Sequence, residues 1–125
     1  MNDRWKESAN MLHAYARALD LVGLLRPIVQ TIRMRDPNLA DQMRRAATSV
    51  VANLAEGQRR EGGNKMRAYE IAHGEAREVL GCLDLATMWG LDVDDLAARA
   101  MLDRLLALCW RLTHPRPREA PQQAQ

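Results

Sequence analysis

Apolar residues recur three and four positions apart along most of this 125-residue chain, which is the spacing of one helical face. The first such stretch spans residues 4–35. Pro27 interrupts it and presses on the carbonyl of Gly23, so we expect a bend between them or a chain that folds back there. Otherwise roughly the first ten residues project beyond shorter neighbouring helices. The predicted inner positions are Leu12, Tyr15, Leu19, Val22, Leu25, Val29 and Ile32.

The second helical stretch, residues 37–60, has a clear start and a clear end. Asp36 and Pro37 are typical of an N-cap followed by the first helical position. Gly57 is a place where the helix can begin to end, and the pair Gly62-Gly63 breaks it. The predicted inner positions are Leu39, Met43, Ala46, Val50, Leu54 and Gly57.

Two further helices are predicted at residues 64–89 and 92–113. Gly90 stops the first of them, and Asp92 is a plausible N-cap for the second. Inner positions are Met66, Tyr69, Ala72, Ala76, Leu80, Leu83 and Ala86, and then Leu96, Ala100, Leu105, Leu108 and Leu112. The sequence therefore predicts an all-α, antiparallel up-down-up-down four-helix bundle over residues 1–114. Residues 115–125 lack apolar periodicity and are expected to be disordered.

Composition agrees with a single soluble helical domain. Hydrophobic residues make up 47% and charged residues 27%, and the chain contains no Phe. No stretch is apolar enough to span a membrane, and the polar N-terminal residues do not resemble a signal peptide. Together with only two cysteines, these features lead us to expect a reduced, cytoplasmic protein.

The formal net charge of +2 is small, but the charges are unevenly distributed. In the predicted bundle one end, here called the basic pole, collects Arg4, Lys6, Arg59, Arg60, Lys65, Arg67, Arg111, Arg116 and Arg118. The acids there are Asp3, Glu7, Glu56, Glu61 and Glu119, and the opposite end holds Asp92, Asp94 and Asp95 near Arg33 and Arg35. One interpretation is a surface for RNA phosphates. The alternative is a solvated end that keeps the protein soluble.

Two tryptophans, Trp5 and Trp110, are expected near the basic pole. Exposed aromatic side chains there would offer a platform for stacked bases. The alternative is that they close the end of the bundle or anchor a contact between subunits.

Catalytic and metal-binding constellations are incomplete. Glu70 and His73 have the spacing of half a di-iron site, but no second such pair exists and the pair is expected at an ordinary helix surface. Cys82 and Cys109 would lie about 13 Å apart along their helices, too far for a disulfide, and are interpreted as small buried hydrophobes. We therefore expect no enzymatic activity, no metal and no cofactor.

Two segments resemble a known family. The sequence QMRRAATSVVANLAEG, residues 42–57, resembles the first motif of the bacterial four-helix bundle proteins, also called the rRNA intervening-sequence protein family. The matching positions are Arg44, Arg45, Ala46, Ala47, Ser49, Asn53, Ala55, Glu56 and Gly57. A second motif at residues 70–86 is similar through Ile71, Ala72, Gly74 and Glu78. The sequence departs at Val50-Val51, His73 and Glu75, where the family has Ile-Pro, Arg and Ser.

The resemblance, which covers residues 14–113, implies a small bundle that assembles as a homopentameric ring without enzymatic activity. One relative, the accessory variability determinant of diversity-generating retroelements, binds a reverse transcriptase and RNA. The leading hypothesis is thus an oligomeric module that contacts RNA or such an enzyme through the basic pole. The alternative is an interaction scaffold that binds no nucleic acid. From its helical position Arg44 is interpreted as an ion-pair or interface residue with a partly covered stem, and Arg45 as exposed.

Overall fold

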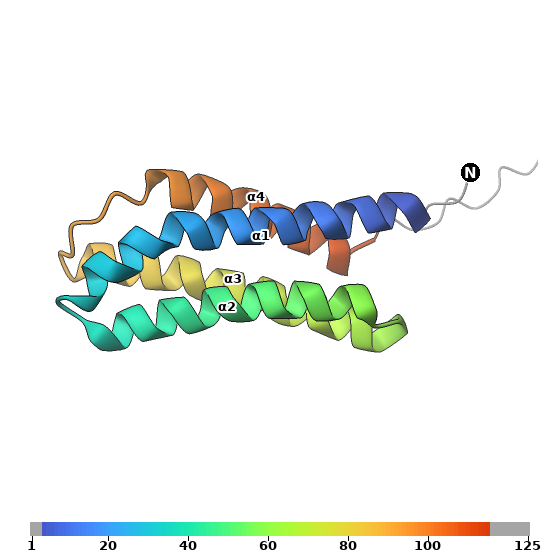
Figure 1. The fold of residues 1–125 in the computed structure, drawn as a ribbon, viewed down its shortest axis with the longest axis horizontal. Helices are drawn as coiled ribbons and strands as arrows, with labels where there is room; N and C mark the ends of the chain where they lie inside the picture. Colours follow the sequence, from blue (N-terminus) through green and yellow to red (C-terminus); the bar gives the residue numbers. More distant parts are fainter. Residues whose placement is uncertain (1–3, 116–125) are drawn as a thin grey trace, which may run out of the picture.

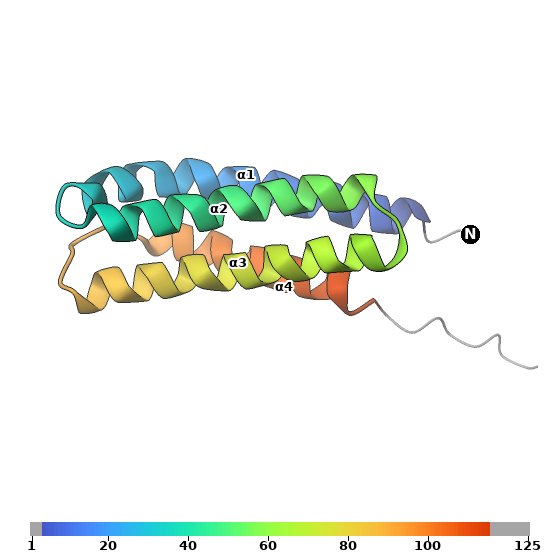
Figure 2. The same cartoon turned by 90° about the horizontal axis from the view of Figure 1, so that it is seen from below.

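The structure is a computed structural model that describes residues 4–115. Its four helices are α1 (Arg4–Arg33), α2 (Pro37–Arg59), α3 (Gly62–Met88) and α4 (Leu96–Thr113). Successive helices run in opposite directions, so they form an antiparallel up-down-up-down bundle (Figure 1, Figure 2). Both α1 and α3 pack against α2 and α4, which places α1 and α3 diagonally opposite each other. The predicted all-α class is confirmed, with no strand in residues 4–115.

Helix α2 forms as its sequence predicts. The carboxylate of Asp36 accepts a hydrogen bond from the backbone N–H of Leu39 at 3.0 Å, and Pro37 occupies the first turn. This cap satisfies a backbone donor that the first turn would otherwise leave without a partner. All the predicted inner positions are buried, namely Leu39, Met43, Ala46, Val50, Leu54 and Gly57.

The inner face of α1 differs from the predicted one. Its buried positions are Ala14, Ala18, Leu21, Leu25, Ile28 and Ile32. Leu12, Leu19 and Val22, which the sequence placed inside, are exposed. The helix carries two apolar stripes, and the stripe that contains Ala14 and Ala18 faces the core. We attribute this to helix spacing, because small side chains at the contact let neighbouring helices approach closely.

α1 is one continuous helix through Gly23 and Pro27. The alternative in which the chain folds back at Pro27 is therefore wrong. The start of α1 projects past the α2–α3 turn in Figure 2, and residues 5–10 are all exposed, as expected for an overhang. Within residues 4–115, no helix combines the length and the apolar character needed to cross a bilayer.

The inner positions predicted for α3 are largely correct. Tyr69, Ala72, Ala76, Leu83 and Ala86 are buried, while the other two, Met66 and Leu80, are half-buried. The helix ends next to Gly90, whose positive φ of 74° suits glycine.

Helix α4 begins later than predicted, at Leu96 and not at residue 92. Residues 91–95 form a connecting segment, so Asp92 is not an N-cap; Asp95 takes that position without a side-chain hydrogen bond to the helix backbone. The predicted inner face is also partly wrong, because Leu96 is 78% exposed and Ala100 is exposed. The buried residues of α4 are Ala98, Leu102, Leu105 and Cys109.

Candidate nucleic-acid interface

The turn between α2 and α3 brings most of the described basic pole together. Arg60 and Glu61 are extended, and Gly62 adopts a φ of +60° that favours glycine. The chain thus reverses two residues before Asn64, the predicted start, and Gly63 already lies in the first turn of α3. The start of α1 and the end of α4 lie at this same end of the bundle (Figure 1). The predicted clustering of these four chain segments is therefore correct.

Four of the six basic-pole cations whose side chains are described are available to a ligand. Lys6, Arg59, Arg67 and Arg111 are exposed and form no ion pair with any carboxylate in residues 4–115. Lys65 is half-buried, with its Nζ atom 3.5 Å from the sulfur of Met11. α1 begins at Arg4 at this end, but the side chain of Arg4, and the whole of Arg116 and Arg118, lie outside the described residues.

Arg60 is the exception within the basic pole. Its Nε donates to the carboxylate of Glu56 at 2.6 Å, one helical turn away. This hydrogen bond, and then the charge of Arg60, hold the pKa of Glu56 below its ordinary value. Because Arg60 is paired, it is less available to phosphate than the sequence predicted. Arg60 is also the ion-pair partner of the family-motif residue Glu56.

Beneath the turn, a buried aromatic ring holds α2, α3 and α1 together. Tyr69 packs against Gly57, where an added Cβ would overlap the ring, and its hydroxyl donates to the sulfur of Met11. The interpretation of Gly57 as the beginning of the helix end is wrong, since α2 continues to Arg59. Burial, and then the charge of Glu7, raise the pKa of Tyr69 to about 12. The basic pole thus lies next to a tightly packed contact between α1, α2 and α3.

Both tryptophans near the basic pole are exposed. Trp5 is 55% and Trp110 51% accessible. The Trp110 ring stacks on His114 with a centroid distance of 4.1 Å and an interplanar angle of 10°. Neither ring closes the end of the bundle, which leaves base stacking and a contact between subunits as the open alternatives.

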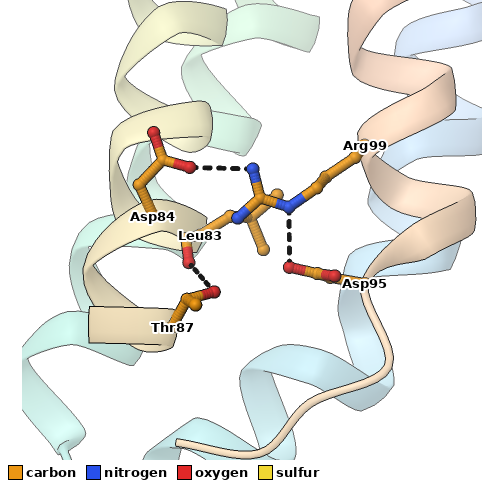
Figure 3. Close-up of polar contacts among 5 residues, drawn as sticks. All are labelled: Leu83, Asp84, Thr87, Asp95 and Arg99. Atoms are coloured by element: carbon orange, nitrogen blue, oxygen red, sulfur yellow. Dashed lines mark hydrogen bonds and ion pairs between the residues drawn. The ribbon is translucent and has the colours of Figure 1, made fainter. Parts of the chain in front are cut away.

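At the opposite end of the bundle Arg33 and Arg99 form ion pairs within the chain, whereas Arg35 is exposed without one in residues 4–115. Arg33 donates to Asp41 at 2.6 Å and ties α1 to α2. Figure 3 shows Arg99 of α4 between Asp84 of α3 and Asp95, with both contacts at 2.8 Å. These two hydrogen bonds raise the pKa of Arg99. Arg33 and Arg99 therefore stabilise the fold and are less available to a ligand than the cations of the basic pole.

Arginines of the first motif lie on the outer surface of α2. Arg44 and Arg45 are both exposed and line a shallow depression with Asp41, Thr48 and Ser49. Arg45 is exposed as predicted. Arg44 forms no ion pair within residues 4–115, so its interpretation as an ion-pair residue is wrong, while the interface alternative stays a prediction.

The remaining motif residues divide between support and surface. Asn53 donates to the carbonyl and hydroxyl oxygens of Ser49, at 2.9 and 3.1 Å, and so stays within α2. Gly74 and Glu78 lie on the exposed side of α3, and nothing lies within 4 Å of a Cβ added at Gly74. Packing within one copy of the chain therefore explains Ala72 of the second motif, which is buried, but not Gly74 or Glu78.

Thiol and metal chemistry have little support in the described part of the chain. Cys82 and Cys109 are free and buried, and burial raises the pKa of Cys109 to about 12, so the thiol stays protonated. Burial also lowers the pKa of His73, with further contributions from Arg77 and His114. Residues 4–115 contain no group of three or more His, Cys, Asp or Glu side chains that could hold a metal ion.

Sequence reasoning missed one group of basic residues beside the basic pole. His13 of α1 and Arg104 of α4 line a second shallow depression together with Arg111. The seven-residue spacing of Arg104 and Arg111 places them on the same side of a helix and could have signalled the pair. His13 could not be added from the sequence, because the register of α1 had been predicted incorrectly.

These features of fold and surface can be set beside known proteins. The model of the family described as 23S rRNA-intervening sequence protein matches residues 10–105. The match spans most of the chain, and this protein therefore belongs to that family. No curated protein matches its sequence.

Proposed function

We propose that this protein is a non-catalytic binding module that contacts RNA through the basic pole, with phosphates as the main ligand groups. The observation that carries the proposal is the cluster of exposed, unpaired cations at the basic pole. Lys6, Arg59, Arg67 and Arg111 are exposed without a carboxylate partner in residues 4–115. At the opposite end Arg33 and Arg99 are paired, and Arg35 is exposed without an ion pair in the same residues. Unpaired cations can bind phosphate and release counterions without first breaking an internal ion pair.

The family description refers to an intervening sequence of 23S rRNA and names no bound ligand, so the surface charges carry the proposal. Within the described chain the cations are dispersed over the ends of several helices, an arrangement that suits backbone phosphates better than base edges. A reverse transcriptase bound to RNA is the alternative partner for the same surface. Either partner would be recognised by charge, so binding should weaken steeply as salt rises.

The test is a titration of a structured RNA at about 50 and about 200 mM salt. Arg59→Glu with Arg67→Glu removes two unpaired cations, while Arg60 and Lys65 stay because each has a partner within the chain. The matched control is Arg26→Glu with Arg35→Glu, two exposed arginines away from the basic pole and without an ion pair in residues 4–115.

We expect the change at the basic pole to weaken binding by about tenfold or more and to reduce the salt slope by about 2. The RNA affinity of the control variant should stay within about threefold of that of the wild type, since its changed charges lie far from the basic pole. Wild-type protein that binds no RNA at the lower salt concentration would remove the proposal. Equal losses in the two variants would show that net charge matters and the basic pole does not.

Self-association is the second part of the proposal. α1 exposes Trp5, Leu12 and Leu19 on its outer side, at 55%, 59% and 47%. α3 exposes Ile71 and Leu85, beside Gly74 and Gly81, where an added Cβ meets nothing within 4 Å. Because α1 and α3 are diagonal, these two unlike apolar faces lie on opposite sides of one copy. Contacts between unlike faces are head-to-tail and form a ring where the rotation between copies closes, and the homopentamer is the ring we propose.

Light scattering after size exclusion measures this assembly. We expect a mass of five times 14.1 kDa and its loss when Leu12→Glu is combined with Leu19→Glu. A monomer at micromolar concentration contradicts the ring. The same exposed faces favour the second candidate function, a self-assembling scaffold that binds no nucleic acid. If the ring forms and the titration detects no RNA binding, this scaffold function replaces the RNA-binding function.

A further inference from the structure

The depression between α1 and α4 has an unusually uniform lining. Three basic side chains, His13, Arg104 and Arg111, surround the apolar side chains of Ala107 and Leu108. No carboxylate belongs to this lining. Arg111 is at once part of the basic pole and part of the depression, so the two surfaces are continuous.

The basic side chains form a row along the two helices. Arg104 and Arg111 are seven residues apart on α4, which is two turns and about 10 Å along the axis. Lys6 precedes His13 on α1 by the same seven residues and therefore lies on the same side of that helix. Basic side chains thus follow the direction of the helices and continue toward the basic pole.

Carboxylates near this row, Glu7 among them, are not part of the lining of the depression. Asp20 of α1 lies two turns from His13 and is held by Arg17 at 2.9 Å. The Nε atom of Arg17 is buried and has no hydrogen-bond partner in the described chain. Asp103 precedes Arg104 in sequence, but successive helical residues are rotated by about 100°, and Asp103 is not among the lining residues.

We infer that this depression binds the backbone of a single RNA strand, with Arg104 and Arg111 on phosphates and Leu108 and Ala107 beneath the sugars and bases. The inference rests on the proposed function. It states where RNA bound at the basic pole would continue, namely along the depression between α1 and α4. Packed helices with axes about 8–10 Å apart leave no free space between them, so the RNA would lie along the surface of the depression. A single strand can place its bases against the apolar side chain of Leu108, whereas a duplex keeps its bases stacked inside.

Two RNA probes of equal length test this path. One is single-stranded oligouridylate, which has no stable base pairing, and the other is a blunt RNA duplex. The variant is Arg104→Glu with Arg111→Glu, both exposed positions, so circular dichroism should remain unchanged. The control is again Arg26→Glu with Arg35→Glu, and Arg104→Lys with Arg111→Lys tests rescue by charge alone.

We expect the wild type to bind oligouridylate more tightly than duplex. The glutamate pair should weaken oligouridylate binding by about tenfold or more and lower the salt slope by about 2. The lysine pair should retain most of the affinity, because phosphate contacts depend mainly on charge.

Unchanged oligouridylate binding in the Arg104/Arg111 glutamate pair, together with a loss in the Arg59/Arg67 pair, would overturn the path and leave the proposed function intact. Tighter binding of duplex than of oligouridylate would overturn the single-strand assignment. If no RNA binds the wild type, both the path and the proposed function fall.

Discussion

The two ends of the bundle are held together by different kinds of interaction. At the basic pole the buried ring of Tyr69 packs against Gly57 and joins α1 through Met11. At the opposite end the guanidinium of Arg99 joins two carboxylates across the segment that connects α3 and α4. Where packing holds the helices, charged side chains remain available for a ligand. Where ion pairs hold them, as through Arg33 and Arg99, those guanidinium groups already have partners.

The largest predicted effect is the loss of the aromatic support at the basic pole. Tyr69→Ala should lower the free energy of unfolding by about 3–5 kcal/mol, as for other large aromatic side chains deleted from a core. Trp89→Ala is the matched change at the opposite end, where the ring is 71% exposed, and should stay within about 0.5 kcal/mol. Urea unfolding measures both. Similar costs would mean that the two ends are held in the same way.

The next prediction compares two glycines within helices. Gly57→Ala inserts a methyl group into the Tyr69 ring and should destabilise the protein by about 1–3 kcal/mol through overpacking. Gly74→Ala meets open space and should stabilise it by about 0.5–1 kcal/mol, because alanine is the better helix former. Opposite signs in thermal unfolding are the expected result. A stabilising Gly57→Ala would show that Tyr69 can move aside without cost.

Alkaline pH should weaken the packing of Tyr69 less than its replacement does. Burial raises the pKa of Tyr69 from 10.0 to about 12, so the folded state keeps the hydroxyl protonated where the unfolded chain begins to lose its proton. This contribution to stability is complete below pH 10 and is lost as pH rises through 12. The difference in unfolding free energy between wild type and Tyr69→Phe should therefore shift against the wild type above pH 10. A difference independent of pH would contradict the burial of this hydroxyl.

The fold was predicted correctly where a helix has one apolar stripe and one cap signal, and less well where it has several. α2 has one apolar stripe and a cap signal at Asp36, and both were correct. α1 has two apolar stripes, and only contact with α2 and α4 selects the one through Leu21 and Leu25. Near the start of α4, Asp92, Asp94 and Asp95 all resemble caps, and local sequence does not rank them.

The sequence could predict which end of the bundle carries the candidate site. It could predict less well which of the charged residues form ion pairs. Connectivity alone brings Arg59 and Lys65 to one end, because helices two and three meet there. The Glu56–Arg60 pair has the i,i+4 spacing that sequence can reveal. Arg99 and Asp84 are 15 residues apart and on different helices, so their contact follows only from the three-dimensional register of α3 and α4.

The smallest predicted effect belongs to the opposite end. Arg99→Ala breaks the contacts with Asp84 and Asp95, whose side chains are 62% and 20% exposed, and should cost about 0.5–1 kcal/mol because partly solvated ion pairs contribute little. Arg104→Ala is the control on the same helix, exposed and without an ion pair in residues 4–115. It should change stability by less than about 0.5 kcal/mol. The cost of Arg99→Ala should shrink further at about 1 M salt, where the screening length falls to about 3 Å. A salt-independent cost well above that of Arg104→Ala would indicate that the Arg99 side chain holds this end by packing, and the contrast between the two ends would then be lost.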